Sequence, residues 1–134
     1  MKKIALGTVM ALATVLSAGH ASAQTALKDV AHVRDGIIAV GMAYEISEQC
    51  DSIRARLFRG YSYLQSLRSH ASGLGFSDDE IDAYINDDAE KDRLEGIARA
   101  QLVALGAVAD DSESYCAVGR AQIAANTRVG WLLR

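Results

Sequence analysis

Residues 27–49, LKDVAHVRDGIIAVGMAYEISEQ, carry the pattern around which the rest of the chain is organised. One set of apolar side chains recurs at helical spacing, namely Val30, Val33, Ile37, Val40, Gly41 and Tyr44. Ile38, Met42 and Ile46 widen this apolar surface beyond a single stripe. A helix that is apolar over so much of its circumference needs cover from several directions. We therefore predict that this helix lies at the centre of the core.

A second helix is predicted to begin at a cap formed by Asp51 or Ser52 and to end at Gly73 and Gly75. Helical spacing assigns its buried face to Ile53, Leu57, Tyr61, Leu64, Leu67 and Ala71. Four arginines flank this face, at positions 54, 56, 59 and 68. They are candidates to pair with acidic residues of the third helix or with a partner.

The clearest local start signal is residues 77–80, Ser-Asp-Asp-Glu, which form a capping box. Phe76 precedes the cap and can pack on Ile81 as a hydrophobic staple. A short third helix to about residue 85 follows. Asp87 with Glu90 then starts a fourth helix, whose expected buried face is Leu94, Ile97, Ala98 and Leu105.

A fifth helix opens at residues 110–112 and places Cys116 beside an inward face made of Tyr115, Val118, Gly119 and Ile123. The chain contains no proline, and Ala, Leu, Arg and Glu are plentiful, whereas runs rich in β-forming residues are few. We predict an all-α fold, a small bundle of about five helices with one disulfide.

Residues 1–23 have the three parts of an export signal. Lys2 and Lys3 form a basic start, an uncharged apolar run follows, and residues 21–23, Ala-Ser-Ala, match a signal peptidase site. We predict cleavage near Ala23 and Gln24, a single helical domain over residues 24–134, and a periplasmic location. The apolar run of about fifteen residues is shorter than the roughly 20 residues that a membrane-spanning helix needs. We therefore expect that the protein is not an integral membrane protein.

The charge balance argues against nucleic acid as a partner. Once Lys2 and Lys3 leave with the signal, 12 basic and 17 acidic side chains remain, a net charge of about −5. Binding to phosphate backbones requires a basic surface. We expect no nucleic-acid partner.

Cys50 and Cys116 are the two cysteines of the chain. Unpaired thiols do not usually persist in an oxidising compartment, which favours a disulfide between Cys50 and Cys116. The bond would tie the end of the first helix to the start of the last. The alternative is a redox-active pair, which the wide separation disfavours because catalytic dithiols commonly have a Cys-x-x-Cys spacing.

Acidic residues crowd together between positions 78 and 95, which raises the question of a calcium site. An EF-hand loop needs Gly at its sixth position and Glu at its twelfth. A loop starting at Asp78 has Ala83 and Ala89 there. We interpret the acids as solvated helix caps, and we expect no metal and no cofactor.

No set of residues typical of catalysis is visible. His32 and His70 lie on different predicted helices without a His or Cys at ligand spacing, and no nucleophile motif or glycine-rich phosphate loop occurs. The five tyrosines are interpreted as packing residues. The sequence therefore does not favour an enzyme, although this functional class stays open.

The tail from residue 128 to 134 contains the only tryptophan, Trp131, followed by Leu132 and Leu133. Tryptophan is enriched in binding hot spots, so these three residues are the candidate partner-binding site. The alternative is that the tail folds back over the end of the bundle.

Several blocks of the chain resemble a small exported alphaproteobacterial family catalogued only as a domain of unknown function. They are Glu45-Ile46 with Cys50, Ile53-Arg54-Ala55-Arg56, Tyr63-Leu64, Gly75-Phe76-Ser77-Asp78, Asp88-Ala89-Glu90-Lys91, Tyr115-Cys116-Ala117-Val118-Gly119-Arg120-Ala121 and Leu132-Leu133-Arg134. The resemblance spans essentially the whole mature chain and implies no activity.

The resemblance does imply a genomic context, because members tend to be encoded near the genes of the proton-pumping NADH:quinone oxidoreductase. Some members are even labelled as the component of that enzyme that holds a [2Fe-2S] cluster. This chain does not fit that label. Such a component needs four cluster ligands, normally cysteines, and faces the cytoplasm, whereas this chain has two cysteines and an export signal.

Two functional hypotheses follow. The first is a non-catalytic periplasmic accessory or interaction protein, associated with the periplasmic face of a respiratory membrane complex. The alternative is a periplasmic ligand-binding or enzymatic domain whose site is assembled from scattered residues. A large pocket lined by Tyr, Arg and a carboxylate would favour the alternative, and a dry continuous core would favour the first hypothesis.

Overall fold

The computed structural model describes residues 25–134, so the predicted signal peptide, residues 1–23, lies outside the described residues. The elements in chain order are a short 3-10 helix η1 (Leu27–Asp29) and the α-helices α1 (Ala31–Gln49), α2 (Leu57–Gly73), α3 (Asp78–Ile85), α4 (Asp88–Ala104), α5 (Ser112–Ala124) and α6 (Arg128–Trp131). The predicted all-α class is confirmed. The added sixth α-helix is a single turn in the tail.

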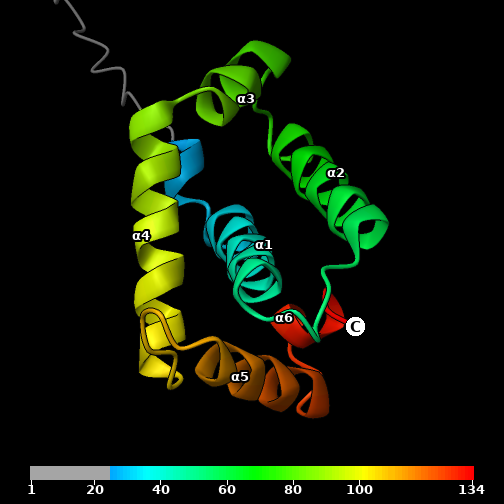
Figure 1. The fold of residues 1–134 in the computed structure, drawn as a ribbon. Helices are drawn as coiled ribbons and strands as arrows, with labels where there is room; N and C mark the ends of the chain where they lie inside the picture. The colour runs from blue at the N-terminus through cyan, green and yellow to red at the C-terminus, as the bar shows by residue number, and fades with distance from the viewer. Residues whose placement is uncertain (1–24) are drawn as a thin grey trace, which may run out of the picture.

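Helix α1 lies at the centre, as its sequence predicts. Figure 1 shows α4 on one side of it, α2 on the other, and α5 and α6 across its C-terminal end. The main core gathers around Ile38, Met42 and Ile46, which face these neighbours. Ile46 is completely buried. Four α-helices cover most of the apolar surface of α1, but Tyr44, which belongs to the predicted apolar pattern, is 56% exposed.

The contact between α1 and α2 is unusually close at one point. Gly36 of α1 faces Leu67 and Tyr63 of α2, and a Cβ placed on Gly36 would lie 2.7 Å from Leu67 Cδ1 and 2.9 Å from Tyr63 Oη. Contacts that short do not occur between real side chains, so the missing side chain is what allows the helices to approach.

The predicted start of the second helix is wrong. Residues 51–56 are not helical, and α2 begins at Leu57 without a side-chain cap. The reason is a contact that the local sequence does not reveal: Ala55 forms an antiparallel bridge with Leu133, Arg54 and Arg134 exchange backbone hydrogen bonds, and the Arg56 amide donates to the Leu132 carbonyl oxygen. We call this pairing of residues 54–56 with 132–134 the clasp.

The clasp also changes which residues of the second helix are buried. Ile53 is buried from the extended segment, and Leu67 and Ala71 are buried from α2. Leu57, Tyr61 and Leu64, which the sequence assigned to the same buried face, are 75%, 62% and 38% exposed. Helix α2 packs on α1 and α3, which leaves the first half of its apolar stripe without cover.

The other helix starts follow the sequence. Ser77 and Glu80 form the predicted capping box, with the Ser77 amide donating to Glu80 Oε2 at 2.7 Å. Asp87 caps α4 by accepting from the amide of Glu90. Asp111, within the predicted opening at residues 110–112, caps α5.

On α4 and α5, two further residues that were predicted to be buried are exposed, namely Leu105 and Ile123. Leu105 is the residue that caps the C-terminus of α4 and points outward, while Leu102 takes the fully buried position one turn earlier. Ile123 lies in the last turn of α5, where the approach of Gly130 from α6 covers its backbone and leaves its side chain partly exposed. In both helices the buried face ends before the apolar sequence pattern does.

A second, smaller group of buried residues lies at the α3 end of the molecule. This satellite cluster contains Leu27, Val33, Ala71, Phe76 and Ile81. Phe76 and Ile81 pack in it as the predicted hydrophobic staple. None of the helices between residues 25 and 134 has the length and apolarity needed to cross a membrane.

Candidate functional site

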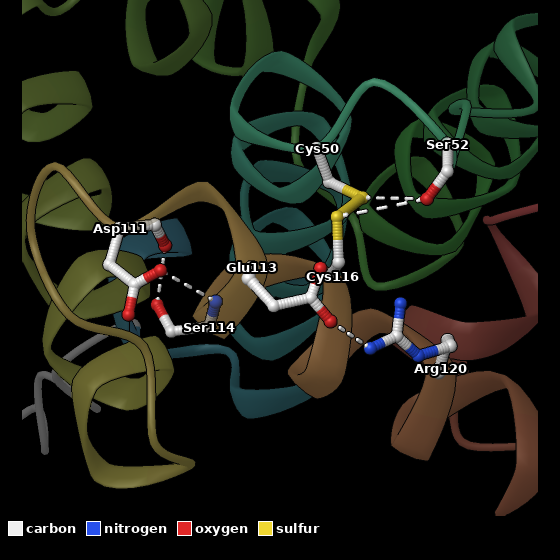
Figure 2. The surroundings of a disulfide bond; sticks show 7 residues. All are labelled: Cys50, Ser52, Asp111, Glu113, Ser114, Cys116 and Arg120. Atoms are coloured by element: carbon white, nitrogen blue, oxygen red, sulfur yellow. Dashed lines mark hydrogen bonds and ion pairs between the residues drawn. A yellow bond between two sulfur atoms is a disulfide. The ribbon is translucent and has the colours of Figure 1, made fainter.

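The predicted disulfide between Cys50 and Cys116 is confirmed and joins the end of α1 to α5, as Figure 2 shows. The two Cα atoms are 5.2 Å apart, and Cys50 is completely buried. The Ser52 hydroxyl lies 3.3 Å from Cys50 Sγ and 3.7 Å from Cys116 Sγ. Among the described residues no cysteine is left free. The bond and the clasp hold the same end of the bundle.

The three candidate partner-binding residues of the tail are in different environments. Leu132 and Leu133 are buried in the main core, at 2% and 1% exposure. Trp131 packs against that core but stays partly exposed. The tail therefore folds back over the bundle, and of the three residues Trp131 alone keeps surface that a partner could contact.

Trp131 is surrounded by cations and an aromatic ring. The guanidinium carbons of Arg59 and Arg128 lie 4.8 Å and 5.1 Å from the centre of its ring system, and the Tyr63 ring meets it edge-on at 5.9 Å. Arg59 Nη1 also donates to the Trp131 carbonyl oxygen at 2.9 Å. These contacts fix the orientation of the indole at the surface.

A hollow of about 830 Å³ opens beside this tail. It lies between the end of α1 and the start of α2, and its charged lining is Glu48, Asp51, Arg54, Arg56, Arg59 and Arg134. Large exposed side chains rise beside these charges, namely Tyr44, Leu57 and Phe58. Sequence reasoning noted the arginines but placed Leu57 in the core, and it did not single out Phe58.

A second opening, of about 320 Å³, is the groove between α2 and α4. Val33 and Ile37 of α1 line it, together with Tyr61 and Leu64 of α2 and Leu94 of α4. Polar groups also line it, namely Gln65, Arg68, Tyr84, Glu90 and Lys91. The groove was not predicted from the sequence, because helical spacing assigned the whole apolar stripe of α2 to the buried face.

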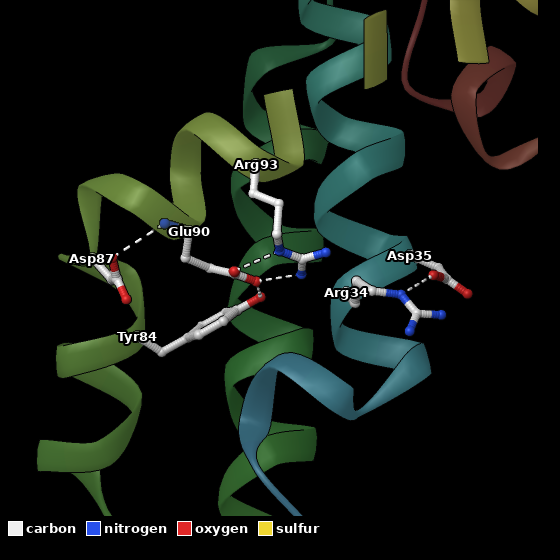
Figure 3. Close-up of polar contacts among 6 residues, drawn as sticks. All are labelled: Arg34, Asp35, Tyr84, Asp87, Glu90 and Arg93. Carbon is white, nitrogen blue, oxygen red and sulfur yellow. Dashed lines mark hydrogen bonds and ion pairs between the residues drawn. The ribbon is translucent and has the colours of Figure 1, made fainter. Parts of the chain in front are cut away.

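The polar side of the groove contains a buried carboxylate, shown in Figure 3. Glu90 is 8% exposed and accepts two hydrogen bonds of 2.7 Å from the Arg93 guanidinium and one of 3.2 Å from the Tyr84 hydroxyl. Hydrogen bonding from Arg93 lowers the pKa of Glu90. Burial, reinforced by the charge of Glu90, raises the pKa of Tyr84 to about 12.

This arrangement suits a structural ion pair better than proton transfer. Both shifts move the groups away from neutral pH, so Glu90 is held as the carboxylate and Tyr84 as the neutral phenol. A general acid or base works best with a pKa near the working pH. Glu90 and Tyr84 can therefore orient a ligand in the groove, but they are poorly placed to exchange protons with it.

Many of the acidic residues of α3 and α4 lie in the first turns of these helices, where they cap the helix or form ion pairs. Arg68 bridges two of them, at 3.3 Å from Asp78 Oδ1 and 2.8 Å from Asp82 Oδ1. Among residues 25–134 there is no group of three or more His, Cys, Asp or Glu side chains placed to hold a metal ion. His32 and His70 come together from α1 and α2, with ring centres 4.6 Å apart.

The comparison with known families decides the identity of the chain. A family model described as a family of unknown function, DUF5333, matches residues 25–134. This chain belongs to DUF5333. The match covers every residue of the helical bundle, the disulfide and the clasp included. No curated protein and no solved structure matches the chain.

Proposed function

We propose that this DUF5333 protein is a non-catalytic helical accessory protein of the periplasm that acts by binding a protein partner. The observation that carries the proposal is the uncovered half of the α2 stripe. Tyr61 and Leu64 are exposed and line the groove between α2 and α4, and Leu57 is exposed one turn earlier on the same stripe. Exposed apolar patches that are rimmed by polar residues are typical of interaction sites.

Trp131 provides a separate contact surface at the clasp end, where it packs on Arg59 and Tyr63. It is held between Arg59 and Arg128, and aromatic residues next to arginine are enriched at protein interfaces. Leu132 and Leu133 contribute by anchoring the tail in the core, while the indole stays at the surface. The export signal and the disulfide support a periplasmic location. The genomic context implied by the family resemblance supports a respiratory membrane complex as the partner.

Affinity purification of the tagged mature protein from membranes, followed by identification of the proteins that co-purify, tests this proposal. The double variant Tyr61→Ser/Leu64→Ser is expected to lose at least tenfold in partner recovery, because it removes the uncovered apolar surface. The change should leave the fold intact, since both side chains are exposed. Ser62→Ala/Ser69→Ala, on exposed positions of the same helix, is the matched control. Equal recovery with all three proteins would contradict the proposal.

Trp131→Ala tests the tail separately. If the indole contacts the partner, recovery is expected to fall by about thirtyfold, the effect of truncating a hot-spot residue. A variant that melts at a lower temperature but recovers the partner normally would restrict Trp131 to covering the core.

The groove itself favours a second candidate function, the binding of a small ligand. Its volume of about 320 Å³ is at the lower end of the range for ligand sites, and Tyr61, Tyr84, Arg68 and Glu90 are among its lining residues. Native mass spectrometry of protein purified from its own host tests this candidate. A small molecule released on unfolding, and lost in a Leu64→Trp variant that fills the groove, would support it. A protein that carries no added mass would leave the partner-binding proposal as the sole candidate.

A further inference from the structure

The start of α2 carries the two most exposed large apolar side chains in the part of the chain that the structure describes. Phe58 is 84% exposed and Leu57 is 75% exposed. Consecutive residues of an α-helix point about 100° apart. The two side chains therefore cannot both enter one narrow pocket of a partner. They form an exposed apolar knob beside the hollow that both of them line, which suits insertion into a continuous apolar medium.

Arginines surround this knob. Arg54, Arg56, Arg59 and Arg134 line the adjoining hollow, and Arg128 lies beside Trp131. We call these five arginines together with Leu57 and Phe58 the arginine tip. In residues 25–134, none of the five is within ion-pair distance of a carboxylate, whereas five other arginines form such pairs, namely Arg34, Arg68, Arg93, Arg99 and Arg120.

The hydrogen bonds that these arginines do make leave most of their donors free. Arg56 Nε donates to the Leu133 carbonyl at 2.8 Å, and Arg59 Nη1 donates to the Trp131 carbonyl at 2.9 Å. A guanidinium has five N–H donors, so each keeps several for an anion. Glu48 and Asp51 also line the hollow, but the four arginines there outnumber them. The tip is thus locally positive on a chain whose acids outnumber its bases.

Two aromatic side chains lie near the hollow that Leu57 and Phe58 line. Tyr44 of α1 is exposed and lines the hollow, and Trp131 is partly exposed between Arg59, which also lines the hollow, and Arg128. Tryptophan and tyrosine concentrate at the level of lipid headgroups, because one part of each ring is apolar and another is polar. Exposed apolar side chains, arginines without an ion-pair partner and exposed aromatic rings are the kinds of group that proteins present to a membrane interface.

We propose that the arginine tip docks on an anionic phospholipid surface. Leu57 and Phe58 enter the boundary between headgroups and acyl chains, and the arginines bind lipid phosphates while their stems stay against the apolar layer. This inference goes beyond the proposed function, because the lipid surface needs no protein partner and the groove residues Tyr61 and Leu64 are not required. A bilayer also accepts both side chains of the knob at once.

Co-sedimentation of the mature protein with lipid vesicles tests the proposal. We expect binding to vesicles of phosphatidylglycerol and phosphatidylcholine, at least tenfold weaker binding to pure phosphatidylcholine, and a further loss as salt rises. Phe58→Ser and Arg54→Gln/Arg134→Gln are each expected to weaken binding at least fivefold. Arg99→Gln and Val103→Ser, on an exposed ion pair and an exposed apolar position of α4, are the matched controls and should bind as the parent does.

Three results would overturn the proposal. They are no sedimentation with anionic vesicles, equal binding to anionic and neutral vesicles, and equal binding by the tip variants and their controls. An acidic protein that binds the tip while vesicles do not would assign the surface to a protein interface instead. Circular dichroism checks that each variant keeps its helices. Tyr61→Ser/Leu64→Ser should bind vesicles normally, which separates this inference from the protein-binding proposal.

Discussion

Removing the disulfide should lower the free energy of unfolding because a cross-link is lost, and not because buried side chains pack less well. The double variant Cys50→Ala/Cys116→Ala keeps both buried positions apolar while deleting the bond. The bond links residues that are 66 positions apart. A cross-link closing a loop of that length restricts the unfolded chain by about 4 kcal/mol. This is a large share of the roughly 5–15 kcal/mol that stabilises a typical domain.

The two single variants provide the sharper comparison. Each of Cys50→Ala and Cys116→Ala already breaks the whole bond, so each should cost about as much as the double variant. If the loss came from packing, the single costs would add, because changes at independent sites add to within about 0.5 kcal/mol.

Urea denaturation of all four proteins, with and without a reducing agent, measures these costs. Reduction should lower the free energy of unfolding of the parent by about the same 4 kcal/mol and leave the double variant unchanged. Additive single costs, or a parent that is indifferent to reduction, would refute the reasoning.

Four further outcomes are expected. Gly36→Ala should lower the free energy of unfolding by about 1–3 kcal/mol, because the added Cβ would meet Leu67. Gly96→Ala, on the exposed side of α4, should instead raise the free energy of unfolding by about 0.5–1 kcal/mol. Urea denaturation midpoints compare the two variants. Ser77→Ala should lose about 1 kcal/mol of cap energy, and an unchanged melting temperature would contradict this. The pKa of Tyr84 is raised from 10.0 to about 12, so its share of stability is intact below the ordinary value and is lost as pH rises toward 12; absorbance titration should show one late tyrosine. The pKa of Glu90 is lowered from 4.5, so its share of stability is present above that value and is lost on further acidification, and Glu90→Gln should flatten the acid limb of the urea midpoint.

What the sequence predicts well is local. The capping box at Ser77 and Glu80 and the cap at Asp87 depend on residues three positions apart, and the structure contains both. The central position of α1 follows from its own wide apolar surface. Even the disulfide needs only two cysteines and an oxidising compartment.

What the sequence predicts poorly depends on distant partners. Asp51 and Ser52 are good caps by residue type, yet the segment after them is extended because it pairs with Leu132 and Arg134 across the clasp. Tyr61 and Leu64 continue the stripe of Leu67, but helical spacing says nothing about where the covering helix ends. The exposed apolar residues that α2 contributes to the groove and to the arginine tip lie within residues 57–64, a stretch for which periodicity predicted a buried helix face. The candidate site could therefore not be predicted from periodicity alone.

The two ends of the bundle are held by different numbers of cross-links and contacts, so they should differ in their stability against local unfolding. The disulfide, the clasp and α6 hold one end, whereas α3 and η1 are held at the other by the satellite cluster, the exposed ion pairs of Arg68 and the hydrogen bond of Tyr84 to Glu90. Backbone amides of α3 should therefore exchange with deuterium long before those of α5, as in a protein with two cooperative units. The groove borders the looser unit, since Leu27, Val33 and Ile81 line both. Whatever enters the groove would consequently slow exchange in α3 first, which makes that helix the natural reporter of occupancy.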